Sequence, residues 1–209
     1  MNQSVEKKPP VSFTDMLRLR FNGLLDPVGR YLNKRGILPN TMTLIGLVGN
    51  ICAAFLLAGG KIEWGGLLVL LMAPVDALDG TMARLRGTPS RFGGFLDSVI
   101  DRYSDLLILG GLLVYYAQQA DWVAVVLAYA AAVGTVLVSY VKARAESANY
   151  KANGGLLTRV ERYIVLVPFL LLNRPVIALG ILAVLANFTA LQRIWIVRNQ
   201  ARTQKDILE

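Results

Sequence analysis

Apolar runs of helical length alternate with short polar turns along most of this chain. Windows of about 20 residues locate six such runs, at roughly 40–60, 64–84, 94–117, 121–141, 160–173 and 175–196. The fifth run is short and can be extended back to about Leu156. Because the connections are brief, we expect the helices to pack as one bundle without a second domain. The pattern therefore predicts an all-α integral membrane protein in which residues 39–198 form a bundle of six transmembrane helices.

Residues 1–38 precede the bundle and have a different pattern. Residues 1–10 are polar, and apolar residues then recur at intervals of three or four: Phe13, Leu17, Phe21, Leu24, Val28 and Tyr31. Charged residues fall largely outside this stripe, as in a helix that lies flat in a membrane interface. We therefore expect a cytoplasmic tail and an N-terminal amphipathic juxtamembrane helix, with 1–209 forming one domain. A soluble amphipathic helix is the alternative, which the adjoining membrane span disfavours.

The charge distribution gives the bundle an orientation. If both termini face the cytoplasm, all of the 22 Lys and Arg residues except Lys61 and Arg174 lie in inner segments, as the positive-inside rule requires. We therefore expect a multi-pass protein of the cell (inner) membrane. The net charge of +8 is spread over separate inner loops, where it can meet the anionic headgroups of membrane lipids. It does not indicate a nucleic-acid partner.

The chain contains no histidine. That excludes Ser-His and Cys-His nucleophile pairs and histidine-ligated zinc. Any acid–base chemistry must be carried out by carboxylates, Lys, Tyr or Cys.

Four aspartates interrupt the apolar runs: Asp76 and Asp79 near the inner end of the second, and Asp97 and Asp101 near the start of the third. A carboxylate in such a run is costly and is rarely kept without a pairing or coordinating role. Spacings of three and four residues put each pair on one helix face, and a short turn makes the two helices antiparallel neighbours. All four carboxylates are therefore expected to meet near the cytoplasmic surface. Hard oxygen ligands suit Mg²⁺ or Mn²⁺, and two such ions can clamp both oxygens of a phosphoryl displacement.

Small residues accompany the acids. Gly80 and Ala83 continue the face of Asp76 and Asp79, and Gly93 and Gly94 precede Asp97. Without bulk at these positions a nucleotide or diphosphate can approach the helices closely, and a neighbouring arginine, Arg84, can donate to a phosphate. The alternative is that Arg84, Arg91 and Arg102 merely neutralise the acids in structural ion pairs, which explains neither the paired spacing nor the glycines.

At these residues the chain resembles the CDP-alcohol phosphotransferase family. The signature of that family is Asp-x2-Asp-Gly-x2-Ala-Arg, a short gap, and Gly-x3-Asp-x3-Asp. Each of its positions is filled here, by Asp76, Asp79, Gly80, Ala83, Arg84, Gly93, Asp97 and Asp101. The family has six transmembrane helices and an interfacial N-terminal helix, so the resemblance extends over most of the chain. It implies a metal-dependent transferase of phospholipid biosynthesis that uses CDP-diacylglycerol, and a homodimer.

The resemblance also implies individual roles. Asp76, Asp79 and Asp97 would bind metal, and Asp101 would bind metal and act as the catalytic general base. The CDP-lipid donor would be held by small, polar and basic residues at the inner helix ends: Pro39, Asn40, Thr41, Met42, Gly80, Ala83, Arg84 and Ser90. The acceptor hydroxyl would attack the β-phosphorus of the donor, and CMP would leave.

A second group of charges indicates the acceptor. Lys142, Arg159, Arg162 and Arg193 all lie at the predicted inner boundary of the membrane and together would form a basic pocket for an acceptor that carries its own phosphate. The alternative is positive-inside anchoring, which does not account for Arg193 within an apolar helix. The surrounding runs, Ser139–Glu146, Arg159–Arg162 and Gln192–Arg193, are similar to those of phosphatidylinositol phosphate synthases and archaetidylinositol phosphate synthases. That similarity implies inositol 1-phosphate as acceptor, and Val160 is a departure, since proline is usual there.

Three other functions fit parts of the pattern. Glycerol 3-phosphate as acceptor would give phosphatidylglycerophosphate and would use a similar basic pocket. A divalent-cation or proton transporter would also contain intramembrane carboxylates, but usually near the midplane and within repeats. A membrane scaffold without catalytic activity would tolerate the loss of Asp101. CMP release from CDP-diacylglycerol separates the enzyme from the last two.

Overall fold

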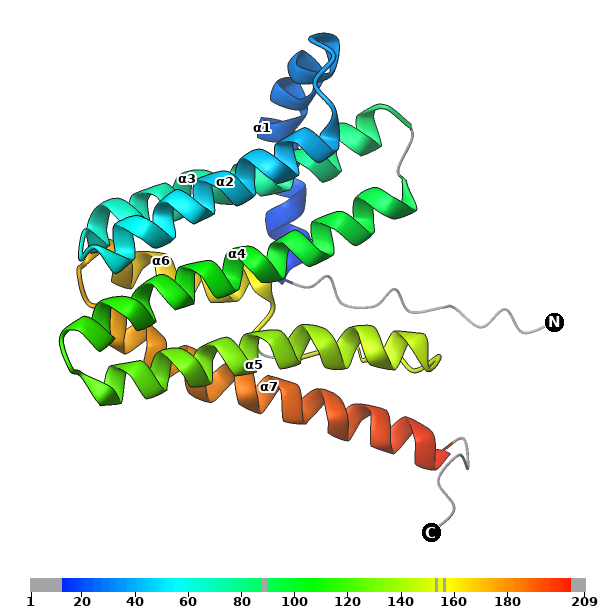
Figure 1. Ribbon diagram of the computed structural model, residues 1–209. Coiled ribbons are helices and arrows are strands. Elements are labelled where there is room, and N and C mark those ends of the chain that lie inside the picture. The colour runs from blue at the N-terminus through cyan, green and yellow to red at the C-terminus, as the bar shows by residue number, and fades with distance from the viewer. Residues whose placement is uncertain (1–12, 88–89, 153, 156, 204–209) are drawn as a thin grey trace.

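The structure, a computed structural model, describes residues 13–87, 90–152, 154–155 and 157–203 (Figure 1). These residues form seven helices: α1 (Phe13–Lys34), α2 (Pro39–Ala58), α3 (Ile62–Leu85), α4 (Arg91–Gln118), α5 (Trp122–Ser147), α6 (Arg159–Leu171) and α7 (Pro175–Thr203). The six apolar runs are thus confirmed as helices. Two of them, α5 and α7, continue past the expected ends at 141 and 196 by about two turns. The predicted tail before α1 lies outside the described residues.

Four of the described helices are long and apolar enough to cross a membrane, namely α2, α3, α5 and α7. The α4 helix is 28 residues long, but charged residues interrupt its apolar run: Asp97, Asp101, Arg102 and Asp105. The α6 helix has only 13 residues, less than a bilayer requires. An all-helical membrane-protein fold is therefore supported, with four rather than six helices that qualify by length and composition alone.

The helix starts follow from local chemistry. Pro39 stands at the first position of α2, where its missing N–H costs nothing. The Ser90 hydroxyl accepts a hydrogen bond from the Gly93 N–H at 2.9 Å and caps α4. The Asp121 carboxylate accepts from the Ala124 N–H at 3.1 Å and caps α5. Each cap satisfies a backbone donor that the helix itself leaves free.

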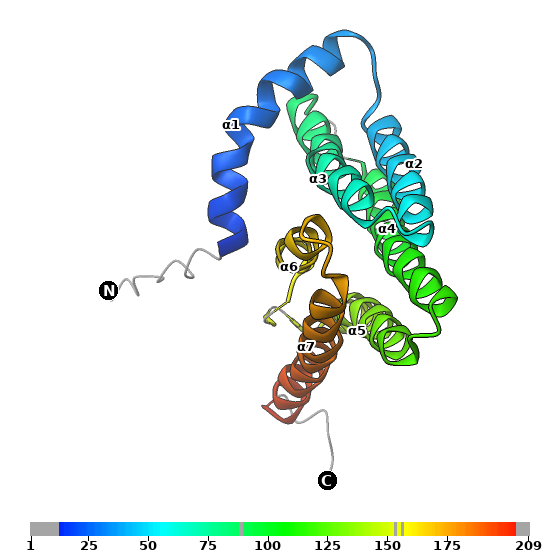
Figure 2. The ribbon, with the colours of Figure 1, turned by 90° about the vertical axis from the view of Figure 1, so that its left-hand side faces the viewer.

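The helices form two closely packed groups that meet along α4 (Figure 2). The first group is α2, α3 and α4, and the second is α5 with α7; α6 lies against α3 and α7. Small side chains let α5 and α7 approach each other, and all of them are buried: Ala124, Ala128 and Ala131 on α5, and Ala178, Ala183, Ala186 and Ala190 on α7. Close approach through small residues is a common way for helices to associate in membranes.

The α1 helix runs across the axis of the bundle and packs against α3 (Figure 1). Its contact face contains Leu25, which joins Met42, Leu78 and Met82 in a small apolar cluster. The described members of the predicted apolar stripe, Val28 and Tyr31, are instead 44% and 56% exposed. This helix therefore has one apolar face toward α3 and a second that the protein leaves uncovered.

Gly111 marks the closest approach of α4 to α2, because a Cβ there would lie 2.5 Å from the carbonyl oxygen of Ala54. We predict that Gly111→Ala lowers the apparent melting temperature in detergent, since overpacking against backbone costs about 1–3 kcal/mol. The matched control is Gly110→Ala, where a Cβ would meet nothing within 4 Å. That change should leave the melting temperature unchanged or slightly higher, because alanine favours helix over glycine by about 1 kcal/mol. Equal melting temperatures for the two variants would contradict the close approach.

Candidate active site

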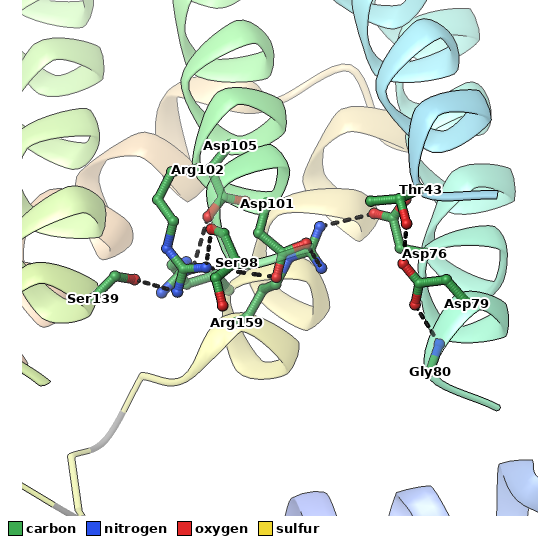
Figure 3. A network of polar contacts seen from close by, with 11 residues as sticks. Thr43, Asp76, Asp79, Gly80, Ser98, Asp101, Arg102, Asp105, Ser139 and Arg159 are labelled. Carbon is green, nitrogen blue, oxygen red and sulfur yellow. Dashed lines mark hydrogen bonds and ion pairs between the residues drawn. The ribbon is translucent and has the colours of Figure 1, made fainter. Parts of the chain in front are cut away.

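Figure 3 shows Asp76 and Asp79 on α3 and Asp101 on α4. The expectation that these two helices are direct neighbours is wrong, because α2 packs against both and they contact each other little. Asp76 and Asp79 occupy the C-terminal part of α3, and Asp97 and Asp101 the N-terminal part of α4. The side chains of Asp76 and Asp101 are 10% and 14% exposed. The charge of Asp97 acts on each of the other three carboxylates. The acids thus form one electrostatic group, as their spacing predicted.

An arginine from a third helix joins this group. Arg159, the first residue of α6, pairs through Nη2 with Oδ2 of Asp76 at 2.8 Å and through Nη1 with Oδ1 of Asp101 at 2.5 Å. Its guanidinium also lies 5.4 Å from the ring centroid of Tyr163, within range of a cation–π interaction. Figure 3 shows Arg159 between the acids of α3 and α4. One cation therefore connects carboxylates on two different helices.

The surroundings of Asp76 leave its carboxylate little freedom. Gly46 of α2 faces it, and a Cβ at this glycine would overlap Oδ1 of Asp76. The absence of a side chain at Gly46 is thus a spatial requirement of the acid on the neighbouring helix.

Asp79 is held differently. Its Oδ2 accepts a hydrogen bond from the hydroxyl of Thr43 on α2 at 2.5 Å, and its Oδ1 accepts one from the Gly80 N–H at 2.5 Å. Asp79 is 7% exposed, so these donors replace hydration that the carboxylate has lost.

Asp101 has a second, weaker cationic neighbour. Nη1 of Arg102 lies 3.7 Å from Oδ2 of Asp101. The same guanidinium donates to the Ser98 carbonyl oxygen at 2.5 Å and to the Ser139 hydroxyl on α5 at 2.9 Å. Arg102 is therefore mainly a link from α4 to α5, and Asp101 depends chiefly on Arg159 for its compensating charge.

The expected meeting of all four carboxylates at shared coordination distance is not what the structure contains. Among the described residues, no three acidic or cysteine side chains converge as the ligands of a metal ion would. The reason is visible in the ion pairs, because the guanidinium of Arg159 stands between Asp76 and Asp101. The alternative of structural ion pairing is thus partly realised, although Arg159 and not Arg84 or Arg91 carries it.

The chemistry of the site nevertheless suits a divalent cation, although the described side chains are not arranged around one. Its donors are carboxylate oxygens, the ligands that Mg²⁺ and Mn²⁺ prefer. A positive group already bridges two of these carboxylates, which shows that the position between α3 and α4 attracts cationic charge.

Some of the predicted donor-binding residues are at open positions, and others contact neighbouring residues of the protein. Gly80 is open, since a Cβ there would meet nothing within 4 Å, and the same holds for Gly94 of α4, which is not itself in the predicted donor set. The Ser90 hydroxyl and the Asn40 side-chain oxygen both approach Gly93, so the starts of α2 and α4 meet there. Pro39 and Ala83 are half-buried, and Thr41 is exposed.

Two further members of the donor set have partners of their own. Arg84 donates to the Thr81 hydroxyl at 3.0 Å. Met42 is 7% exposed within the apolar cluster that joins α1 to α3. Its side chain is therefore a packing group, and any contact it makes with a donor would use its backbone.

The four predicted acceptor residues are not equivalent. Lys142 is exposed and pairs with Glu146 of its own helix at 3.8 Å. Arg162 is 5% exposed and pairs with Asp105 at 2.7 Å. Only Arg159 of the four contacts the predicted catalytic and metal-binding carboxylates.

Arg193 is also buried, at 6% exposed. It donates to the Gly154 carbonyl oxygen at 2.9 Å and to the Val138 carbonyl oxygen at 2.6 Å. It thereby ties the segment before α6 to α5. Arg162 and Arg193 are near enough for their like charges to act on each other, an arrangement that an anion would relieve.

Three residues of the site were missed by sequence reasoning. Asp105 continues the four-residue spacing of Asp97 and Asp101, and this period was a signal that could have revealed it. Thr43 and Gly46 carried no such signal, because their importance comes from contact with α3 across the bundle.

Comparison with known proteins places this site in a family. Residues 36–195 match the CDP-alcohol phosphatidyltransferase family. The chain is 37% identical over 201 residues to a phosphatidylinositol phosphate synthase of Streptomyces avermitilis, covering 88% of this chain and 82% of that protein.

The structure is also similar to two crystal structures of the phosphatidylinositol phosphate synthase of Mycobacterium tuberculosis. One has CDP-DAG bound and superposes with a TM-score of 0.76 at 32% identity, covering 83% of this chain and 92% of the other. The second is a complex with manganese and citrate, with a TM-score of 0.77 at 32% identity over 83% and 88% of the two chains. The family match spans both halves of the aspartate signature and the basic residues that follow it. The chain belongs to the CDP-alcohol phosphatidyltransferase family.

Proposed function

We propose that this protein transfers a phosphatidyl group from CDP-diacylglycerol to inositol 1-phosphate, giving phosphatidylinositol phosphate and CMP. The observation that carries the proposal is the set of carboxylates on α3 and α4 that Arg159 bridges, beside the open glycines Gly80 and Gly94. The similarity to phosphatidylinositol phosphate synthases, one of them with CDP-DAG bound, supports the donor and the acceptor.

Asp76, Asp79, Asp97 and Asp101 are the residues we assign to the metal, which we propose to be two Mg²⁺ or Mn²⁺ ions. The manganese complex of the Mycobacterium tuberculosis relative supports a divalent ion. When bound, such ions neutralise charge that develops on the phosphoryl oxygens and on the leaving group.

The protein's own residues account for the other requirements of the reaction. Gly80, Ala83 and Gly94 leave room for the diphosphate of the donor, and Arg84 and Ser90 provide hydrogen-bond donors beside it. Asn40 at the start of α2 lies close to Gly93, where it is suited to contact the cytidine end. Pro39, Thr41 and Met42 form the rest of that helix start.

We assign the proton transfer to Asp101. Its carboxylate takes the proton from the acceptor hydroxyl as the hydroxyl oxygen forms a bond to the β-phosphorus. The bond from that phosphorus to the bridging oxygen of the diphosphate breaks, and CMP leaves with the electron pair. Asp101 is mostly buried and ion-paired, so its position is well defined, and positioning supplies much of the rate acceleration in such transfers.

The acceptor phosphate requires positive charge near Asp101, and Arg159 is already there. We assign direct contact with the phosphate to Arg159 and to the exposed Lys142. Arg162 and Arg193 lie behind them with protein partners and add positive potential to the pocket. Glycerol 3-phosphate is the second candidate acceptor, because it carries the same phosphomonoester.

We infer that α2, α3, α4, α5 and α7 each cross the membrane and that the 13-residue α6 makes the fifth crossing over only part of the bilayer thickness, with both termini and the site on the cytoplasmic side. The lysines and arginines at the site ends of the helices support this orientation. The charged N-terminal part of α4 would lie at the cytoplasmic surface. The α6 helix would begin near that surface, at Arg159 and Arg162, and extend into the bilayer. The exposed Val28 and Tyr31 of α1 suit an amphipathic helix at the interface. Family resemblance supports a homodimer.

We predict that Asp101→Asn abolishes CMP release while the protein remains folded. The amide cannot accept the proton, and loss of general base catalysis costs about 10²–10⁴ in rate. Turnover is followed as CMP formed from CDP-diacylglycerol, with the melting temperature as a check on folding. Asp121→Asn, the same change at the other end of the bundle, serves as control. Normal CMP release by Asp101→Asn would refute the general-base assignment, whereas wild-type protein that releases no CMP would point to a scaffold or a transporter.

We predict that Gly46→Ala weakens both divalent-metal binding and turnover, because the new methyl group must displace the Asp76 carboxylate. Changes that reorient metal ligands through a neighbour typically cost about 10- to 100-fold in affinity or activity. Gly49→Ala is the matched control on the same helix, since its Cβ would meet the flexible end of Met72. Mn²⁺ affinity, measured by electron paramagnetic resonance of the free ion, should fall only for Gly46→Ala. Equal behaviour of the two variants would exclude a metal role for Asp76.

We predict that purified protein releases CMP with inositol 1-phosphate and that free inositol does not replace it, because the basic residues near Asp101 require a phosphate. Each candidate acceptor is supplied separately with CDP-diacylglycerol and Mg²⁺, and the lipid product is identified by mass spectrometry. Turnover with glycerol 3-phosphate alone would refute the inositol assignment and leave the family chemistry intact.

A further inference from the structure

A buried ion pair lies one helical turn beyond the catalytic acids. Asp105 of α4 and Arg162 of α6 are 7% and 5% exposed, and Nη2 of Arg162 lies 2.7 Å from Oδ2 of Asp105. Asp105 stands next to Asp101 on the same side of α4 (Figure 3). The family signature ends at Asp101, so neither the signature nor the proposed chemistry gives Asp105 a role.

The two ion pairs between α4 and α6 form a ladder. Asp101 and Asp105 are four residues apart on α4, and Arg159 and Arg162 are three residues apart on α6. Both spacings put the paired groups on one helix face. The α6 helix packs mainly on α3 and α7, so these pairs fix how its first turn meets the catalytic helix.

A contribution to stability does not by itself explain the ion pair between Asp105 and Arg162. Replacing a buried ion pair by apolar residues of similar volume is often neutral or stabilising, and a pair contributes best when its remaining donors are satisfied. Here Nε of Arg162 has no hydrogen-bond partner among the described protein atoms. A cavity of about 20 Å³ adjoins the pair and is lined in part by Thr135, so packing around it is incomplete.

The two arginines differ in what they can reach. Arg162 is enclosed, whereas the Arg159 side chain is 26% exposed and contacts Asp76 and Asp101. A fixed Arg162 determines where the helix begins and therefore where Arg159 points. A bidentate arginine depends strongly on such orientation.

We propose that Asp105 is a positioning residue for acceptor binding. By holding Arg162, it sets the first turn of α6 so that Arg159 faces both Asp101 and the acceptor phosphate. Gly80 and Ser90 of the donor site are held by contacts within α3 and α4, so a change in the first turn of α6 should affect the acceptor more than the donor. This inference rests on the proposed function.

Steady-state kinetics of Asp105→Asn, with each substrate varied separately, test the proposal. The KM for inositol 1-phosphate should rise about tenfold or more, because small misplacements of a binding group are costly, while the KM for CDP-diacylglycerol stays unchanged. Asp105→Glu keeps the charge and should restore most of the acceptor affinity. Asp121→Asn is the matched control and should change neither KM. A merely structural role would reduce the amount of active enzyme and leave both KM values alone, and that result would overturn the proposal.

A double-mutant cycle keeps the test decisive if single variants lose some stability. If Asp105 acts through Arg162, Asp105→Asn combined with Arg162→Gln should raise the acceptor KM no more than Arg162→Gln alone. Additive effects would overturn the proposal. If Asp105→Asn does not fold, Asp105→Glu is compared with wild type, and a normal acceptor KM together with a lowered melting temperature would also overturn it.

These outcomes differ from failure of the proposed function. If wild-type protein uses another phosphorylated acceptor, the inositol assignment fails and the same KM comparison is made with that acceptor.

Discussion

The bridge from Arg159 to Asp76 and Asp101 is the interaction on which the rest of the site depends. Carboxylates near the apolar interior of a bundle are costly unless a counter-charge reaches them. Here one guanidinium, itself mostly buried, serves acids on two helices. Because Arg159 begins α6, the bridge also joins α3, α4 and α6 at a single point. The short α6 helix thereby becomes part of the site although it contributes little to the span of the bundle.

Glycines in this protein have two opposite spatial roles. Gly46 and Gly111 lie where another group already fills the space that a side chain would need. They permit close packing, in one case against a carboxylate and in the other against backbone. A Cβ at Gly80 or Gly94 would meet nothing within 4 Å, so these positions are open. Glycine thus occurs in this protein both at close helix contacts and at open positions.

The positive charges show a similar division. Lys142 is exposed, whereas Arg162 and Arg193 are buried with partners inside the protein. Positive-inside anchoring explains exposed charges at helix ends but does not explain arginines that are enclosed. Arg193 joins α7 to α5 and to the segment before α6, and Arg162 joins α6 to α4. The basic residues near the acids therefore have two roles. They create a positive electrostatic potential that suits an anionic acceptor, and they hold the surrounding helices in position.

The helices, the pairing of acids on helix faces and the family resemblance could all be predicted from the order of residues along the chain. These features depend on short-range periodicity and on spacing within one segment, both of which are local. Three contacts could be learned only from the folded bundle: Arg159 between Asp76 and Asp101, Thr43 with Asp79, and Asp105 with Arg162. Such partners come from helices far apart in sequence, and their contacts depend on how the helices pack and rotate against one another. Periodicity predicts which face of a helix a residue occupies, whereas the residue that contacts this face depends on how the whole bundle packs.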